Sequence, residues 1–416
     1  MITDVPLEDA LPAHVRPRVL FLNRSYWPDT EATGQLLTAL CEGLAENFEV
    51  HVLAGCPNST TNQSEWKSIN QRNGVTIHRV EHTTFPKRNM ALKAVNFLSF
   101  VNACRKHMRQ LPPPDILVFE TDPFLLPFVA DRYCQQNQTK MVGYLQDIYP
   151  DVAVALKKVQ NSWAIRWLRS KLFNIYSRCN KMVVLSKDMK QLLKDSNISK
   201  DKISIIPNWA DTDQIVPIES DNMFRKQHSI AEKFVAMYSG NLGLTQRLED
   251  FIAAAAILKD DSEIQFVFVG EGARKRELQE LTKSLNLTNV IFCGYQPLDQ
   301  LSHSLGAADI HLVPLTAELS QCLMPSKLYG ILAAGRPILT NAPQTSELYE
   351  VTKTNNVGFV VQAGSPHEIA NAILAAKSDK PSLAQMRVRA RRLAEERYTK
   401  AHAVTAFTQL LTEVAQ

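Results

Sequence analysis

The chain has 416 residues, more than one ordinary domain core accommodates, so two or three domains are expected. Its 45% hydrophobic and 21% charged residues are typical of a folded globular protein, and no apolar run reaches the roughly 18–20 residues of a membrane-spanning helix. The net charge of +4 is uneven: residues 1–210 hold 26 Lys/Arg against 19 Asp/Glu (+7), and the rest hold 20 against 23 (−3). This asymmetry arises either by chance or because the first half faces something anionic, such as a membrane surface or a phosphorylated acceptor.

Cysteine and histidine usage argues against disulfides and metal sites. The seven cysteines are scattered without a Cys-x-x-Cys pair, and the ten histidines show no metal-ligand spacing. The first residues carry no basic-then-apolar leader, so we expect reduced thiols in a cytoplasmic protein. The sequence has no P-loop, no Gly-x-Ser-x-Gly, no His-Glu-x-x-His and no Gly-x-Gly-x-x-Gly after the first strand.

Short β-branched runs alternate with helical patterns from the N-terminus onward. The runs are apolar without alternation, as in strands buried on both faces of a parallel sheet. Strands are predicted over 18–23, 49–54, 75–80, 115–119, 141–145 and 181–185, and helices near 34–46, 90–109, 123–136, 160–179 and 187–194.

The same pattern restarts after a polar, proline-containing linker at 207–226. The sequence therefore predicts an α/β fold with two doubly wound Rossmann-like domains, 1–208 and 209–416, that face each other across a cleft. C-terminal helices follow, and the last is a candidate for returning to the N-terminal domain. Strands are predicted over 234–239, 265–269, 290–292, 310–313, 337–340 and 358–361, and helices near 247–258, 272–285, 298–306, 326–334, 366–377 and 382–414.

Ten of the fifteen glycines follow residue 210, and several stand at the ends of predicted strands. Gly240 and Gly243 lie in YSGNLGLTQRLED, Gly270 and Gly272 lie in VGEGARKR, and Gly294 follows the strand predicted over 290–292. Each glycine alone is explained by a tight turn. Three such loops in succession favour a nucleotide or phosphate site, because free backbone N–H groups and Arg247 suit a diphosphate.

The stretch 324–337, MPSKLYGILAAGRP, carries a lysine in an unusual place. Ser326 is expected to cap a helix, and Lys327 falls in its first turn, where a positive charge opposes the helix dipole. A bound anion explains this lysine better than solvation does. Arg247 and Lys327 are therefore predicted to face the cleft beside the Gly240–Gly243 loop.

Three further loops are candidates for ligand contact. They are 23–35, which opens a helix near Gly34; 144–151, where Asp147 follows a strand; and 206–212 at the domain junction. Ordinary connections, turns and helix caps explain each of them equally well.

In order, YSGNLG, VGEG, CGY, AADIHLVPL, PSKLYGILAAGRP and GFVVQAGSP resemble the retaining GT-B glycosyltransferases of family 4. LNRSYWPD, DIYPD and IPNWADTD are similar to its branch of colanic-acid-type exopolysaccharide glycosyltransferases. The resemblance spans roughly residues 17–400. It implies a nucleoside-diphosphate-sugar bound by the second domain, an acceptor bound by the first, and retaining transfer without a protein nucleophile. It also implies no metal and no other cofactor.

The family's usual donor-binding residues are only partly present. Asn241 and Gln246 replace a common Arg and Lys, with Arg247 as a substitute, and Gln146 replaces a His before Asp147. Two common glutamates are replaced by Cys322 and Gly330, so that Glu318, Glu347 or backbone groups would take their place. By this resemblance the candidate catalytic positions are Asp147 and Gly34. The donor-binding candidates are Gly240, Asn241, Gly243, Arg247, Gly270, Glu271, Ser326, Lys327, Leu328 and Glu347.

The resemblance thus predicts sugar transfer to a glycan or lipid-linked acceptor, in extracellular or cell-surface polysaccharide or glycolipid biosynthesis. No nucleic-acid-binding module is recognisable. Two alternatives remain open: a nucleotide-sugar epimerase on the same fold, which needs an acid/base pair in the cleft, and a non-catalytic nucleotide-sugar-binding protein.

Two basic amphipathic stretches, 87–110 and 157–181, predict peripheral contact with the inner face of the membrane. A helix that covers a Rossmann sheet also needs an apolar face, which is the competing explanation. Burial of the two tryptophans in the second stretch would contradict membrane contact. The apolar residues are Ala91, Leu92, Val95, Leu98 and Val101 in the first stretch, and Trp163, Ile165, Trp167, Leu168 and Leu172 in the second.

Overall fold

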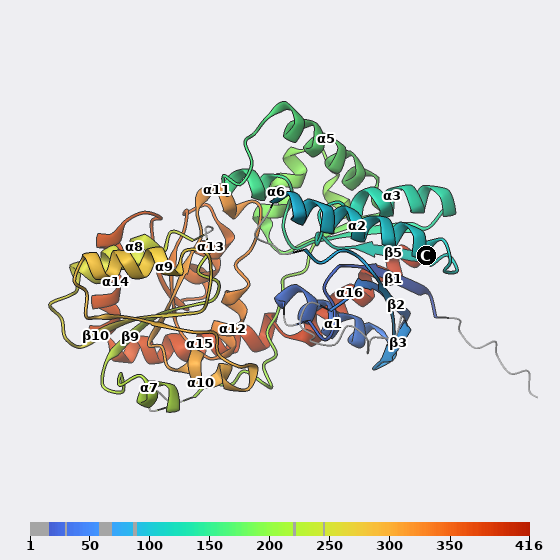
Figure 1. Cartoon of the computed structure of the whole chain (residues 1–416). Coiled ribbons are helices and arrows are strands. Elements are labelled where there is room, and N and C mark those ends of the chain that lie inside the picture. Colours follow the sequence, from blue (N-terminus) through green and yellow to red (C-terminus); the bar gives the residue numbers. More distant parts are fainter. Residues whose placement is uncertain (1–15, 30, 58–68, 86–89, 219–221, 244–245) are drawn as a thin grey trace, which may run out of the picture. The chain divides into compact units, whose positions relative to one another are not determined.

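The computed structural model describes residues 16–29, 31–57, 69–85, 90–218, 222–243 and 246–416 (Figure 1). Some predicted residues lie outside these ranges. They are the first residues of the chain, Thr30, Lys87, Arg88, residues 219–221 of the linker and residues 244–245 of the glycine loop. The chain forms two compact units, residues up to 142 with 408–416, and 143–407. The predicted division after residue 208 falls between the last strand of one sheet and the first strand of the other.

The first sheet has eight strands in the order β3-β4-β2-β1-β5-β6-β7-β8. β1, β2, β4 and β5 run parallel, and β3 runs antiparallel to β4. All six predicted strands are present, whereas β3 was missed because its INQR sequence is polar, and β8 because it has three residues. The strands are β1 (Arg18–Leu22), β2 (Glu49–Gly55), β3 (Ile69–Arg72), β4 (Val75–Val80), β5 (Ile116–Phe119), β6 (Lys140–Leu145), β7 (Lys181–Val184) and β8 (Ile203–Ile205).

The second sheet has six strands in the order β11-β10-β9-β12-β13-β14, and every neighbouring pair is parallel. The carboxyl ends of these strands therefore lie along one edge, where ligands bind in doubly wound folds. All six were predicted. They are β9 (Phe234–Ser239), β10 (Ile264–Val269), β11 (Val290–Cys293), β12 (Ile310–Pro314), β13 (Ile338–Asn341) and β14 (Gly358–Val361).

The helices connect successive strands, which confirms the predicted α/β fold with two parallel-sheet domains and a helical C-terminus. Four of them were not predicted as helices: α4, α7, α11 and α13, which have four to eight residues each. The helices are α1 (Ala32–Leu44), α2 (Met90–Met108), α3 (Leu126–Asn137), α4 (Asp151–Ala155), α5 (Trp163–Arg178), α6 (Lys187–Asp195), α7 (Met223–Gln227), α8 (Leu248–Ile257), α9 (Lys275–Ser284), α10 (Leu301–Gly306), α11 (Ala317–Ser320), α12 (Lys327–Ala333), α13 (Glu347–Thr354), α14 (Pro366–Ser378), α15 (Lys380–Arg397) and α16 (Lys400–Ala415).

Alternate residues of β9 and β10 face two separate cores. Tyr238 and Phe266 belong to a core with α8, α9 and α14, whereas Met237 and Val267 belong to a core with α7 and residues 307–308. Figure 1 shows these helices on opposite sides of the sheet. Burial on both faces explains why the strands are continuously apolar, and it fixes the positions of the loops at the carboxyl edge.

The end of the predicted linker is a short helix, α7, rather than irregular chain. Asn222 caps it by accepting a hydrogen bond from the backbone N–H of Arg225, at 3.0 Å. Arg225 is buried, pairs with Asp309 at 2.6 Å and donates to the carbonyl of Ala307 at 2.7 Å. Long-range partners of one arginine thus order a segment that has no apolar periodicity of its own.

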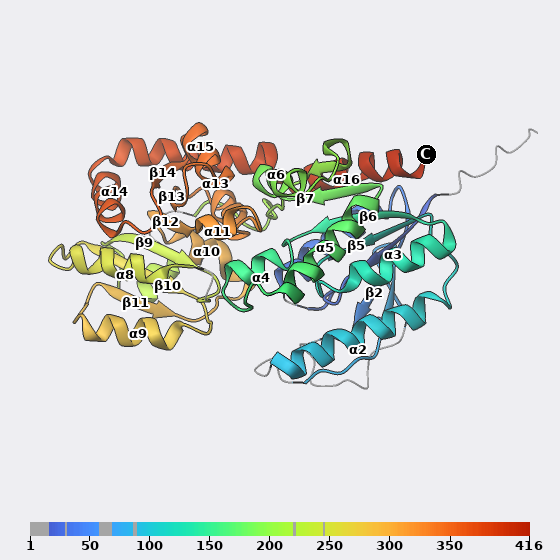
Figure 2. The same ribbon diagram turned by 90° about the horizontal axis from the view of Figure 1, so that it is seen from above.

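Within the described residues, no helix combines the length and the apolar character needed to cross a bilayer. In the first unit, α2 packs against α3, as Figure 2 shows.

Candidate functional site

The loops that follow β9, β10 and β11 are hydrogen-bonded to one another at the carboxyl edge of the six-stranded sheet. Gly240 donates to the carbonyl of Val269 at 2.9 Å, and Leu242 donates to that of Glu271 at 2.8 Å. At Gly270, where φ is +141°, an added Cβ would lie 2.0 Å from the carbonyl oxygen of Gly240. The contact between the loops therefore requires glycine here, whether or not a ligand also approaches.

Gly240 leaves room for the side chain of Lys327. A Cβ on Gly240 would lie 3.3 Å from Cε and 3.6 Å from Nζ of this lysine. The ammonium donates to Tyr238 Oη at 2.7 Å and lies 4.0 Å from the centroid of the Tyr238 ring. Tyr238 in turn donates to the carbonyl of Asn241 at 2.8 Å, so β9, the glycine loop and the start of α12 hold the lysine in place.

Lys327 has no carboxylate partner in the part of the chain that the structure describes. Burial lowers the pKa of its ammonium to about 7. A cation held beside glycine loops without a counter-charge is a ready receptor for an anionic group. The structure places Lys327 beside Gly240, and its role in donor binding stays a prediction.

Arg247 lies at the same edge of the sheet but against a different loop. Its guanidinium pairs with Asp250 at 3.2 Å, and a Cβ on Gly364 would lie 3.3 Å from Arg247 Nη1. The arginine side chain is 52% exposed. Its charge also reaches Glu318, whose pKa is lowered first by hydrogen bonds from its own backbone and from Thr316, and then by Lys157 and Arg247. Lys327 and Arg247 thus occupy two places along one strand edge.

Ser326 does not act as the predicted helix cap. It occupies the N-cap position of α12 but has helical dihedral angles, φ −60° and ψ −26°, and its side chain makes no capping hydrogen bond. A serine in this conformation cannot turn its hydroxyl back to the first N–H groups of the helix. Leu328 is fully buried, and its backbone N–H donates to Pro325 at 3.2 Å.

Glu347 belongs to a reciprocal pair of helix caps. Its carboxylate accepts a hydrogen bond from the backbone N–H of Lys187 at the start of α6. Asp188 accepts one from the backbone N–H of Glu347 at the start of α13, at 2.9 Å. Burial raises the pKa of both carboxyls. The carboxylate of Glu347 therefore joins the starts of two helices.

Two candidates in the glycine loops, Asn241 and Glu271, have exposed side chains, and Glu271 pairs with Lys275 at 2.5 Å.

The loop after β6 is joined to the segment that precedes α12. Asp147 forms a β-bridge with Leu323, and Ile148 donates to the carbonyl of Cys322 at 2.9 Å. Gln146 is buried and accepts from Asn208 at 2.8 Å, and Asn208 accepts from Tyr144 at 3.1 Å. The bridge partner of Asp147, Leu323, precedes Lys327 by four residues in the sequence, so the loop after β6 contacts the segment that leads into α12.

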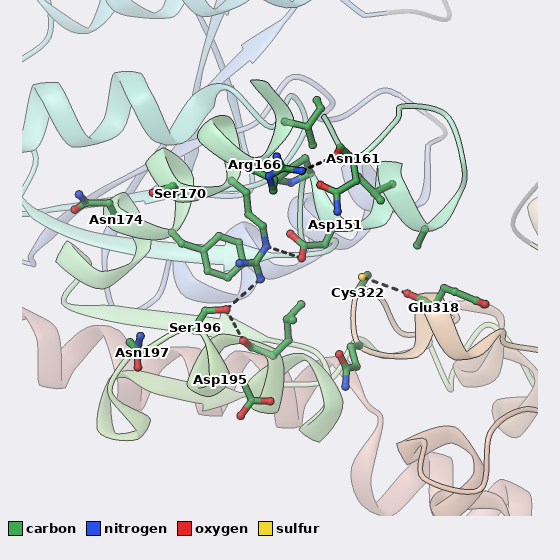
Figure 3. Close-up of a pocket in the computed structure, with 18 of the residues that line it drawn as sticks. Asp151, Asn161, Arg166, Ser170, Asn174, Asp195, Ser196, Asn197, Glu318 and Cys322 are labelled. Carbon is green, nitrogen blue, oxygen red and sulfur yellow. Dashed lines mark hydrogen bonds and ion pairs between the residues drawn. The ribbon is translucent and has the colours of Figure 1, made fainter. Parts of the chain in front are cut away.

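A pocket of about 950 Å³ opens beside this bridge (Figure 3). It lies among α4, α5, α6 and the segment from α11 to Cys322. Arg169 holds one wall together: it pairs with Asp151 at 2.7 Å, donates to Ser196 at 3.1 Å and stacks 4.0 Å from the Phe173 ring centroid. Motif analysis did not find this pocket, because its residues come from four separate segments.

The pocket lining is polar but electrically balanced. Three cationic and three carboxylate side chains accompany seven amide or hydroxyl side chains on an apolar floor. Burial raises the pKa of the Cys322 thiol to about 12, and the charges of Asp151 and Asp147 act in the same direction, so the thiol stays protonated. All seven cysteines are free. The ionic residues are Lys157, Arg166, Arg169, Asp151, Asp195 and Glu318, and the neutral polar ones are Asn161, Asn174, Asn197, Gln321, Ser170, Ser177 and Ser196.

Gly34 lies in the other compact unit, in the first turn of α1. A Cβ at this position would lie 2.6 Å from Ser25 Oγ, and Thr38 donates to the Gly34 carbonyl at 2.7 Å. Trp27 donates its backbone N–H to Thr38 Oγ at 3.0 Å. Glycine is therefore needed for packing under the 23–29 loop. In the described ranges, no three His, Cys, Asp or Glu side chains are arranged to hold a metal ion.

Comparison with known proteins gives concordant matches. The profile of Glycosyltransferase Family 4 matches residues 33–214, and that of Glycosyl transferases group 1 matches residues 219–393. The chain is 27% identical over 263 residues to a protein of Pseudomonas aeruginosa named as glycosyltransferase WbjE, which covers 62% of this chain and 65% of that protein. It is 25% identical over 359 residues to an Escherichia coli protein named as colanic acid biosynthesis glycosyl transferase WcaI, with 81% and 86% covered.

Among solved structures, HepE from Anabaena in complex with UDP-glucose has a TM-score of 0.73 to this chain at 15% identity. The superposition covers 95% of this chain and 100% of that chain. At this identity the likeness shows the fold alone.

Lys327→Met is expected to raise stability while removing the candidate anion receptor. A lysine whose folded pKa is about 7, below its unfolded value, destabilises the fold while it is charged below pH 7. The penalty falls as pH rises from 7 toward the unfolded pKa. The variant should therefore gain about 1–3 kcal/mol at pH 6 and little at pH 10, measured by urea denaturation. Equal stability of both proteins at pH 6 would contradict this account of Lys327.

Proposed function

Since the chain belongs to the family 4 glycosyltransferases of GT-B fold, we propose that it transfers a sugar, with retention, from a nucleoside-diphosphate-sugar to a glycan or lipid-linked acceptor. The product belongs to cell-surface or extracellular polysaccharide or glycolipid. The observation that carries the proposal is the Lys327 ammonium, held at Gly240 without a carboxylate. The UDP-glucose bound by HepE and the colanic acid role in the name of WcaI support the donor and acceptor classes.

The donor diphosphate is assigned to the edge that carries Lys327 and Arg247. Charge-assisted hydrogen bonds are among the strongest available to a protein, and a diphosphate needs several of them. Lys327 supplies a cation, and Arg247 lies 52% exposed; among the described residues, Asp250 is the one ionic partner of Arg247. These two cations take the place of a metal ion in neutralising the diphosphate, so transfer proceeds without a metal.

The transfer step needs no covalent enzyme intermediate. The bond between the anomeric carbon and the diphosphate oxygen breaks, and the acceptor hydroxyl oxygen forms its bond on the same face. The hydroxyl proton passes to the departing diphosphate. The chain contributes by stabilising the negative charge that develops on the leaving group and by positioning the acceptor.

The acceptor glycan is assigned to the 950 Å³ pocket of Figure 3. Its volume lies within the range of ligand sites, and its donors, acceptors and balanced charges suit an uncharged polyhydroxyl chain better than a polyanion. The Asp147–Leu323 bridge ties the pocket wall at Cys322 to the segment that ends at Lys327. In this proposal the segment 322–327 therefore connects the acceptor pocket, at Cys322, to the donor site, at Lys327.

Peripheral membrane contact accompanies the lipid-linked acceptor in this proposal. Trp163 and Trp167 are 76% and 57% exposed on α5, and Val95 and Leu98 are 43% and 59% exposed on α2. Leu172 of the same helix is buried in the core, so part of the apolar face of 157–181 covers the sheet. The exposed aromatic residues, flanked by Arg166 and Lys171, are the part of that stretch that suits a lipid headgroup layer.

Loss of either donor-side cation should weaken UDP binding. Lys327→Met and Arg247→Ala are each expected to cost about 1–3 kcal/mol of affinity, the contribution of a charge-assisted hydrogen bond. Calorimetry with UDP measures this, with Arg276→Ala as control because Arg276 is a 91% exposed arginine that pairs with Glu280 on the same helix. Addition of EDTA should leave turnover unchanged. Unaltered UDP affinity in Lys327→Met would refute the donor assignment.

Filling the pocket should block the acceptor and spare the donor. Ser170→Trp places an indole in the pocket, whereas Ser284→Trp places one on an exposed position of α9. Release of nucleoside diphosphate, assayed with a lipid-linked oligosaccharide extract, should fall at least about tenfold in the first variant only. UDP affinity should stay the same in both. Release that is equally fast without acceptor, or formation of an epimeric donor, would overturn the transferase proposal.

The membrane contact of α5 is tested by removing its two tryptophans. Trp163→Ser/Trp167→Ser should reduce flotation with phosphatidylglycerol vesicles, because the indoles no longer enter the headgroup layer. Tyr295→Ser/Leu298→Ser is a matched control, since these residues are 60% and 57% exposed in another loop. If the wild-type protein stays at the bottom of the gradient, the peripheral assignment fails.

A further inference from the structure

Three arginines line a hollow between α2 and α3, away from the residues assigned to donor and acceptor. Arg105 and Arg109 come from the last turns of α2 and the residues after it, and Arg132 comes from α3. The hollow has a volume of about 470 Å³ and contains Phe128, Tyr133 and two amide side chains, but no carboxylate. α2 and α3 lie side by side in Figure 2.

These arginines differ from most others in the part of the chain that the structure describes, where most arginines pair with a carboxylate or a carbonyl. No hydrogen bond or ion pair is made by Arg105, Arg109 or Arg132 within the described residues. In the same compact unit, Arg18, Arg24 and Arg72 pair with carboxylates at 3.0, 2.8 and 2.6 Å. Three guanidinium groups around one hollow repel one another, and an external anion relieves that repulsion.

The hollow continues the exposed face of α2. Val95, Leu98, Arg105 and Arg109 follow one another at spacings of three, seven and four residues, so they lie on one face of the helix and its extension. Val95 and Leu98 are 43% and 59% exposed, and both arginines are exposed as well. This face therefore changes along its length from apolar to cationic. Such a face suits a lipid surface, where acyl chains lie next to phosphates.

We propose that the Arg105–Arg109–Arg132 hollow binds the phosphodiester anions of lipid head groups while Val95 and Leu98 enter the adjoining apolar layer. The proposal rests on the membrane contact described above and extends it to α3 and to a chemically selective site. Guanidinium forks match phosphate oxygens bidentately, and Tyr133 and the amides Gln136 and Asn137 supply further hydrogen-bond donors. An acidic protein partner would make no use of the exposed apolar residues on the same face.

The test compares vesicles of phosphatidylcholine with vesicles that also contain phosphatidylglycerol, using the full chain. Arg105→Gln/Arg109→Gln/Arg132→Gln should bind the anionic vesicles on the order of a hundredfold more weakly, because each basic residue at such a surface contributes about 1 kcal/mol. Binding to neutral vesicles should be unchanged. Higher salt should reduce wild-type binding more than that of the variant, because screening acts on the arginines.

A second triple variant separates a built site from net charge. Arg276→Gln/Arg392→Gln/Arg397→Gln makes the same change of charge at exposed positions in the other unit and should keep its binding to anionic vesicles. Equal loss in the two variants would overturn the proposal, as would full binding by the α2–α3 variant. Saturable binding of soluble glycerol phosphate without vesicle binding would replace the lipid with a free phosphate ester.

UDP affinity distinguishes this proposal from the proposed function. The α2–α3 variant should bind UDP like the wild type, since its substitutions lie outside the donor assignment. If the wild type binds no nucleotide yet binds anionic vesicles through these arginines, the transferase proposal falls and the head-group site stands. Unaltered thermal stability shows that the exposed substitutions leave the fold intact.

Discussion

The close approach of two loops governs the geometry at the carboxyl edge of the six-stranded sheet, where Lys327 lies. The carbonyl oxygen of Gly240 occupies the space next to Gly270 that any side chain would fill, with 2.0 Å between that oxygen and the position of a Cβ. The same contact places the loop after β9 under the ammonium of Lys327. The parallel strands, buried on both faces, fix the positions at which the loops begin. Because glycine has no side chain, the two loops can approach each other closely. Replacement of either glycine would therefore disturb the lysine as well as the backbone.

Charge compensation divides the ionic residues of the second unit into two groups. Arg225 with Asp309, and Arg169 with Asp151, hold separate segments together at 2.6 and 2.7 Å. Glu347, which the family resemblance offers as a replacement for a missing glutamate, is occupied at the start of α6. By contrast, the partner of Lys327 among the described residues is the phenol of Tyr238 and not a carboxylate. The uncompensated group is thus the one that stands beside the glycine loops.

The sequence was sufficient for the parts of the fold that depend on local pattern. All twelve predicted strands are present, because unbroken apolar runs between glycine-rich turns are typical of buried parallel strands. The polar edge strand β3 and the short helices α4, α7 and α11 lack such a pattern, and tertiary partners such as those of Arg225 create them.

At the site, residue type and position in the chain singled out Lys327 and the glycine loops before any family was considered. They could not locate Tyr238 as the lysine's partner or the pocket around Arg169, since these contacts join residues far apart in the chain. The capping role predicted for Ser326 was wrong because it assumed an extended backbone that this residue does not have. The sequence pattern therefore identified a residue such as Lys327, a lysine in the first turn of a helix. Its partners come from distant parts of the chain and could not be predicted.

The reciprocal caps between α6 and α13 have a consequence for how the second unit responds to pH. Each helix start supplies the acceptor for the other, through Glu347 and Asp188, so two hydrogen bonds join the same pair of helix starts. Burial raises the pKa of both carboxyls. Protonation of either one removes the negative charge that makes it a strong hydrogen-bond acceptor. As the pH falls, these two carboxyls therefore lose their charge before exposed carboxylates do, and the connection between the two helix starts weakens.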